Sequence, residues 1–130
     1  MEETRYPSFD ELVEVNRTVI KEIRVRKADA ARVLSTSILQ NIISHARRTE
    51  GDIYDKAASL LIDLTRFHPF ASGTRRTAYL ATRLFLEWND ASIRVVHEPS
   101  VLQGIREAFY TREEVKAWLK GDEIRKFSRG

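Results

Sequence analysis

The chain has 130 residues, a length that predicts one folded domain over residues 1–130. Of its residues, 42% are hydrophobic and 32% are charged, and its net charge is +3. This composition excludes a disordered chain. It contains no cysteine, which excludes disulfides and thiolate metal sites. No apolar run approaches the roughly 18 residues of a membrane span, and the acidic N-terminus lacks the apolar stretch of a signal peptide, so we expect a cytoplasmic protein without a membrane partner.

The first predicted helix runs from Ser8 to about residue 23. Ser8 and Glu11 have the spacing of a capping box, in which each side chain accepts a hydrogen bond from the other residue's backbone N–H. Apolar side chains recur every three to four residues along one face: Leu12, Val15, Val19 and Ile23. Residues 24–34 are ambiguous, and a short extended piece is one reading of their alternation of apolar and charged residues.

A second helix is predicted from about Ser35 to Arg48, and Glu50-Gly51 ends it. Its inward-facing side chains are expected to be Ile38, Leu39, Ile42, Ile43 and Ala46. Asp52 can cap a third helix. The inward-facing side chains of that helix are expected to be Ile53, Ala57, Leu60, Leu61 and Leu64.

Pro69 ends the third helix, because a residue that precedes proline avoids the helical region, and this places His68 at the helix end. A fourth helix is predicted from Gly73 or Thr74 to about Trp88. It is apolar on most of its sides, as is typical of a helix buried at the centre of a bundle. Residues 89–92 have the composition of a turn, and the β-branched residues 93–96 favour an extended connection.

Pro99 occupies the first position of a fifth helix, which is expected to reach about Tyr110. Thr111 and Glu114 form another capping box, which begins a sixth helix that ends near Leu119, before the terminating residue 121. The charged residues after it are expected to fray. The sequence therefore predicts an all-α fold, a single-domain bundle of about six helices around a central apolar helix.

The segment from His68 to Arg76 reads His-Pro-Phe-Ala-Ser-Gly-Thr-Arg-Arg and opens the fourth helix. A helix N-terminus presents unpaired N–H groups and a partial positive charge, which favour a phosphate. Arg75 and Arg76 add forked donors suited to phosphate, and His68 can act as a base beside them. No Asp or Glu occurs from Leu64 to Leu86, which concentrates positive charge here. These features point to chemistry on a phosphate-bearing ligand.

Several of these residues also have purely structural interpretations. His68 can cap the last carbonyls of its own helix, and Gly73 can be an ordinary glycine at a helix start. Arg66 and Arg83, the other arginines between Leu64 and Leu86, can solvate helix faces. His45 and His97 have no comparable setting in the sequence, and we expect them to be structural.

The same segment resembles the signature of the Fic/Doc family, His-Pro-Phe-x-Asp/Glu-Gly/Ala-Asn-x-Arg. The residues that stand where the family has them are His68, Pro69, Phe70, Gly73 and Arg76. Ser72 replaces the family's acidic residue, and Thr74 replaces its asparagine. The flanking residues from 52 to 89 are also similar to those of Doc proteins, as are residues 9–12 and 113–119 more weakly. The resemblance therefore covers nearly the whole chain and implies the helical Fic-like fold.

The resemblance implies a role for each residue of the segment. His68 would activate a hydroxyl group of a target protein, which attacks a nucleotide phosphate, and Arg76 would contact that phosphate. Gly73 would let the backbone approach the phosphate, and Thr74 would cap the helix or donate to an oxyanion. The expected scaffold residues, which stiffen the turn and anchor the loop, are Pro69 and Phe70.

Arg75 stands where AMP-transferring Fic proteins mostly carry glycine and Doc-type kinases carry lysine, so this chain looks closer to Doc. That likeness implies transfer of the terminal phosphoryl group of ATP or another nucleoside triphosphate, with nucleotidyl transfer as the alternative. It also implies the toxin of a toxin-antitoxin pair. The Ser/Thr-x-x-x-Glu-Gly/Asn pattern of a built-in inhibitory helix fails here, because Ala46 lies four residues before Glu50. We therefore expect a separate antitoxin.

Ser72 makes a Mg²⁺ cofactor doubtful, because serine is a weak, neutral ligand at the usual metal-ligand position. Asp55 and Asp63, on the preceding helix, are candidates to supply a carboxylate instead. The competing hypothesis is a catalytically degenerate nucleotide- or partner-binding module on the same fold. Nucleic acid is the least favoured partner, because the sequence has no helix-turn-helix signature and no interleaving of aromatic and basic residues.

Overall fold

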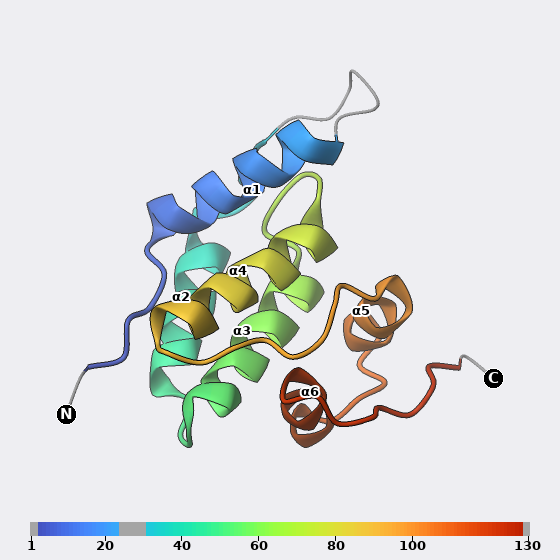
Figure 1. Cartoon of the computed structure of the whole chain (residues 1–130). Helices are drawn as coiled ribbons and strands as arrows, with labels where there is room; N and C mark the ends of the chain where they lie inside the picture. Colours follow the sequence, from blue (N-terminus) through green and yellow to red (C-terminus); the bar gives the residue numbers. More distant parts are fainter. Residues whose placement is uncertain (1–2, 24–30, 129–130) are drawn as a thin grey trace.

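The computed structural model describes residues 3–23 and 31–128, and these residues form six helices without a sheet (Figure 1). The helices are α1 (Phe9–Ile23), α2 (Thr36–Arg48), α3 (Ile53–Phe67), α4 (Thr74–Trp88), α5 (Pro99–Arg106) and α6 (Arg112–Leu119). The predicted all-α fold with about six helices is confirmed. Among the described residues, no helix is long and apolar enough to cross a membrane.

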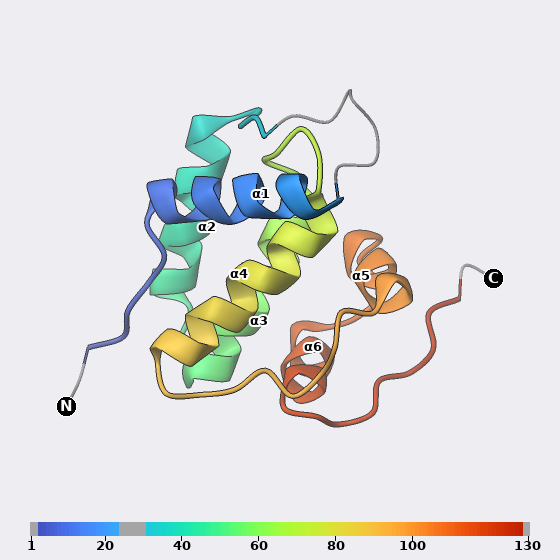
Figure 2. The same ribbon diagram turned by 45° about the horizontal axis from the view of Figure 1, so that its top comes forward.

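Helices α3 and α4 lie side by side in the middle of the bundle (Figures 1 and 2). Helix α1 packs on α4, α2 packs on one side of α3, and α5 and α6 pack on its other side. The largest fully buried side chains of the two middle helices are Leu60, Leu61, Leu64, Phe85 and Leu86. The central position predicted for α4 is therefore shared with α3, which contacts four of the other helices.

Local sequence signals set most helix starts as predicted. Ser8 Oγ accepts a hydrogen bond from the Glu11 N–H at 3.0 Å, and the Ser8 N–H donates to Glu11 Oε1 at 3.0 Å. Asp52 and Thr111 begin α3 and α6 with the same reciprocal pattern, each using an acidic residue three positions later. These caps satisfy N–H groups that the first turn of a helix leaves unpaired.

Periodicity misplaces one residue of α2. Ile38 was expected to face inward, but its side chain is 37% exposed. The buried face of α2 runs through Leu39, Ile42 and Ala46, and Ile38 lies at the edge of this face on the first turn. Since α2 packs mainly on α3, only the stripe that faces α3 is covered.

The fifth helix is shorter than predicted. It ends at Arg106 rather than near Tyr110, because Ala108 adopts a left-handed conformation with φ 58°. The Phe109 N–H then donates to the Gly104 carbonyl at 2.9 Å and closes the helix end. No glycine, proline or capping side chain marks this boundary in the sequence, which explains the error.

The prediction that the C-terminal tail frays is wrong for residues 122–128. Arg125 Nε lies 2.6 Å from Glu114 Oε2, so the tail is tied to α6. The ring of Phe127 lies edge-on to Phe109, with the two ring centroids 5.2 Å apart. The tail thus covers the segment that joins α5 and α6.

A short extended contact joins the chain before α2 to the loop after α3. Val33 and Phe70 form an isolated antiparallel bridge, in which the Leu34 N–H donates to the Pro69 carbonyl at 2.7 Å. The segment that the sequence left ambiguous is therefore not helical over residues 31–34. Its remainder, residues 24–30, and the side chain of Ile23 lie outside the described residues.

Candidate functional site

The loop between α3 and α4 carries the segment that the sequence singles out. Its backbone turns at two left-handed residues, His68 (φ 52°, ψ 57°) after α3 and Gly73 (φ 70°, ψ 23°) before α4. Between them, Phe70 is buried in the core at 1% exposure, as expected for an anchor. The loop is therefore fixed at both ends and in its middle.

Gly73 lies against α1. A Cβ atom at this position would lie 3.1 Å from both Val19 Cγ1 and Ile20 Cδ1, which is closer than ordinary van der Waals contact. The positive φ and the close approach of α1 both favour glycine here. The structure thus gives Gly73 a packing role in addition to any contact with a ligand.

Asn16, which the sequence analysis missed, holds the loop in place from α1. Its side chain is 1% exposed, and its Nδ2 donates to the Ser72 carbonyl at 2.9 Å and to Thr77 Oγ1 at 3.0 Å. A signal was present in the sequence, because Asn16 lies on the apolar stripe of α1 between Leu12 and Val19. A polar residue on a buried face needs partners, and here they belong to the loop and to α4.

The imidazole of His68 is oriented by Thr74. Its Nδ1 lies 2.7 Å from Thr74 Oγ1, and the Thr74 side chain is largely buried. When Nδ1 carries the proton and donates to this hydroxyl, Nε2 presents a lone pair that can accept a proton. Thr74 does not cap α4, because Gly73 occupies the N-cap position and has no side chain to cap with. The capping role that the sequence offered for Thr74 is therefore wrong.

A pocket of about 420 Å³ opens beside this loop. Its walls are formed by His68, Ser72, Gly73, Thr74, Arg75, Arg76, His97, Pro99 and Arg106. The structure thus brings together every residue that the sequence assigned to catalysis or phosphate binding. The predicted scaffold residues Pro69 and Phe70 lie in the core and do not line the pocket.

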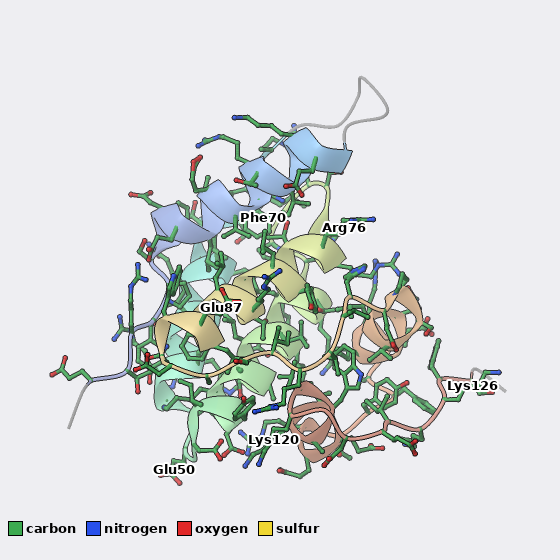
Figure 3. The ribbon with its side chains drawn as sticks, in the orientation of Figure 1. Glu50, Phe70, Arg76, Glu87, Lys120 and Lys126 are labelled. Atoms are coloured by element: carbon green, nitrogen blue, oxygen red, sulfur yellow. The ribbon has the colours of Figure 1, made fainter. Side chains whose placement is uncertain are left out.

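Three arginines from two helices line the pocket. Arg76 extends outward from the first turn of α4 (Figure 3), and its neighbour Arg75 donates from Nη1 to Gln103 Oε1 of α5 at 2.9 Å. Arg106 lies near the end of α5. Within residues 3–23 and 31–128, none of the three is in an ion pair with an acidic side chain. Their charges are therefore available to an anionic ligand.

His97 lines the same pocket, although the sequence gave no reason to place it there. Its Nε2 is buried and has no hydrogen-bond partner among the described residues. Its ring lies edge-on to Tyr79, with the ring centroids 5.6 Å apart. Burial lowers the pKa of His97, and the positive charges of Arg76 and Arg75 lower it further. The ring is therefore neutral at pH 7.

The side chains of this pocket do not suit the Mg²⁺ ion that the family resemblance implies. Mg²⁺ prefers carboxylate oxygens, but no Asp or Glu of residues 3–23 and 31–128 lines the pocket. Asp55 instead bonds Lys116 Nζ at 2.9 Å, and Asp63 lies 2.5 Å from His45 Nδ1 in a separate pocket. The expectation that either could replace the missing acid is wrong. His45 pairs with Asp63 outside this pocket, and the structural role expected for it stays a prediction.

A protein-family model described as the Fic/DOC family matches residues 6–86. No curated protein matches the chain. The matched range contains α1 to α3 and most of α4, and with them the loop that carries His68. It ends before α5 and α6, so the weaker likeness of residues 113–119 to Doc proteins stays a prediction. The closer likeness to Doc than to AMP-transferring Fic proteins also stays a prediction.

Proposed function

The chain belongs to the Fic/Doc family, which transfers nucleotide-derived groups to proteins, and we propose that it moves a phosphoryl group from a nucleoside triphosphate to a protein hydroxyl. One observation carries this proposal. His68, oriented by Thr74, lines a pocket in which every charged side chain of the described residues is an arginine. Such a pocket pairs a base with groups that stabilise phosphate charge.

The reaction that fits this arrangement needs one base and several cations. His68 Nε2 takes the proton of the acceptor hydroxyl while the hydroxyl oxygen bonds to the γ-phosphorus. The bond from that phosphorus to the oxygen bridging the β- and γ-phosphates breaks, and a nucleoside diphosphate leaves. Arg75 and Arg76 line the pocket beside His68 and would offset the negative charge of the phosphates.

The choice of phosphoryl over nucleotidyl transfer rests on Arg75, the basic residue that resembles the lysine of Doc-type kinases. Gln103 holds this arginine from α5, which favours a fixed phosphate contact over a flexible surface charge. A toxin that is controlled by a separate antitoxin accords with this assignment and forms part of the same proposal.

A second candidate function is a nucleotide-binding module that has lost catalysis. Ser72 favours it, because this residue stands at the position of the family's acidic residue and the described part of the chain brings no carboxylate to the pocket. In that case the arginines would still bind a nucleotide, but no acceptor group would be modified.

Labelled nucleotides separate these functions. Lysate proteins are incubated with the chain and with ATP that carries ³²P at either the γ- or the α-phosphate. Phosphoryl transfer labels proteins only from γ-labelled ATP, and nucleotidyl transfer labels them from α-labelled ATP. The variant His68→Ala should lose this labelling, whereas the matched control His45→Ala should keep it, because His45 lies outside the pocket.

Two results would contradict the proposal of phosphoryl transfer. Undiminished labelling by His68→Ala would exclude this residue as the base. Binding of ATP without labelling from either nucleotide would favour the binding module.

A further inference from the structure

We propose that the pocket binds polyphosphate as the free anion, with Arg106 of α5 supplying the positive charge that a divalent cation supplies in other phosphate-transfer sites. This inference rests on the proposed function, because it specifies the ligand form that the same pocket accepts. It also assigns a binding role to Arg106, a residue that the sequence did not single out.

The oxygen donors in the pocket are too few and too weak to hold a divalent cation. Among the residues that the structure describes, the only lining side chains with oxygen atoms are the hydroxyls of Ser72 and Thr74, and Thr74 is already engaged by His68. Hard cations such as Mg²⁺ require carboxylate oxygens or phosphate oxygens with water to complete their coordination. Three guanidinium groups would also repel a cation that approached without its phosphate.

Helix α5 presents one continuous face to the pocket. Pro99, Gln103 and Arg106 are spaced at i, i+4 and i+7, which places them in a row on one side of a helix. Pro99 and Arg106 line the pocket, and Gln103 between them binds Arg75. The Gln103 side chain is itself held, since its Nε2 donates to Glu107 Oε2 at 2.5 Å. The face thus positions two arginines, one directly and one through Gln103.

Arg106 has the properties of a phosphate ligand. Its side chain is exposed, and no acidic side chain in the described part of the chain pairs with it. A guanidinium donates two parallel hydrogen bonds to a phosphate group. Arg75 and Arg76 approach the pocket from the start of α4, and Arg106 approaches it from α5. A ligand with two or more linked phosphates can contact both helices.

This part of the pocket lies outside the segment that the family model matches. The match ends at Leu86, whereas His97, Pro99 and Arg106 follow it. The loss of an acid at position 72 and the arginine on α5 therefore occur in different parts of the chain but face the same pocket. Together they replace a metal-based site with an arginine-based one.

Calorimetric titration with inorganic pyrophosphate tests the inference, once in EDTA and once with excess Mg²⁺. The wild-type chain should bind pyrophosphate in EDTA, and Mg²⁺ should not strengthen this binding. Arg106→Gln should weaken binding in EDTA by about tenfold or more, the effect of one lost charge-assisted contact. The matched control Arg48→Gln removes an exposed arginine from α2, outside the pocket, and should change binding by less than about twofold.

A circular dichroism spectrum shows whether Arg106→Gln still folds, and Arg106→Lys provides a second check. Lysine keeps the positive charge but cannot donate two parallel hydrogen bonds to one phosphate. The pyrophosphate affinity of Arg106→Lys should therefore fall between those of the wild type and Arg106→Gln. Pyrophosphate binding that requires Mg²⁺, or equal affinities of Arg106→Gln and wild type, would overturn the inference. Tight binding in EDTA without any transfer of label would contradict the proposed transferase and leave this inference standing. Failure to bind pyrophosphate in either condition would overturn this inference, whereas the labelling experiment decides the transferase separately.

Discussion

His68 has a backbone conformation that is costly for any residue except glycine. Its φ of 52° lies in the left-handed region, which costs energy for a residue with a Cβ atom. Pro69 follows it and disfavours the right-handed helical conformation that would continue α3. The imidazole is thus carried by a residue whose backbone conformation would favour glycine. Strain of this kind is common at functional sites, where it is tolerated because surrounding packing enforces it.

Replacing His68 with glycine and with alanine separates strain from chemistry. Both variants lose the imidazole and its bond to Thr74, so they differ only in backbone freedom. We expect His68→Gly to be more stable than His68→Ala by about 1 kcal/mol, because only alanine has a Cβ that disfavours the left-handed conformation. Urea unfolding of the two variants measures this difference. An alanine variant as stable as the glycine variant would mean that the loop relaxes to another conformation.

His97 makes stability depend on pH. Its pKa in the folded chain lies below the ordinary value of 6.5, because of burial and then of the charges of Arg76 and Arg75. The unfolded chain therefore binds this proton more readily, and the free energy of unfolding should fall as the pH drops from about 7.5 to 5.5. In His97→Gln this fall should be smaller, as urea unfolding across that range would measure. A variant with the slope of the wild type would show that His97 is solvated in the folded chain.

At the scale of the elements, α1 matters because it fixes the loop that carries the site. Asn16→Leu keeps the size of the side chain but leaves the Ser72 carbonyl and the Thr77 hydroxyl without their donor. We expect a loss of about 2 kcal/mol in unfolding free energy, the typical penalty for unpaired buried polar groups. The matched control Asn41→Leu changes an exposed asparagine of α2 and should stay within about 0.5 kcal/mol of the wild type. Equal effects in denaturant titrations would contradict the role of Asn16.

The helices that the sequence predicted well are those whose ends depend on neighbouring residues. The capping residues bond partners within one helical turn, so their spacing in the sequence is enough to predict a helix start: Ser8 with Glu11, Asp52 and Thr111. Pro69 likewise acts on the residue before it. The sequence did not predict the early end of α5, because that end depends on the left-handed conformation of Ala108. Alanine rarely adopts this conformation, so its presence in the sequence does not indicate it.

The candidate site was predictable only as far as it is contiguous in the sequence. The residues from His68 to Arg76 share one loop and one helix start, so their proximity follows from the chain itself. His97 and Arg106 reach the pocket only because α5 packs on α3, and that packing is decided by contacts between distant residues. The pairing of Asp63 with His45 also joins residues far apart in the sequence. It engages a carboxylate that the sequence left as a candidate metal ligand.

At the scale of the whole molecule, the pocket lies between α4 and α5, which both pack on α3. Helices α1 and α4 position the loop with His68, and α5 supplies the opposite wall. The tail supports that wall, because Phe127 approaches within 3.2 Å of where a Cβ on Gly104 would lie, and Arg125 pairs with Glu114. His97 and Arg106 thus come from the C-terminal third of the chain, whereas the base and the other two arginines come from the preceding part.

The row formed by Pro99, Gln103 and Arg106 has a consequence for how such a protein diversifies. Substitutions on this face can change which phosphorylated compound is accepted while leaving the loop with His68 untouched. A substitution at position 106 can therefore change ligand choice alone, whereas a substitution at position 103 also releases Arg75. A library randomised only at positions 103 and 106 would explore new donors without passing through variants that lack the base.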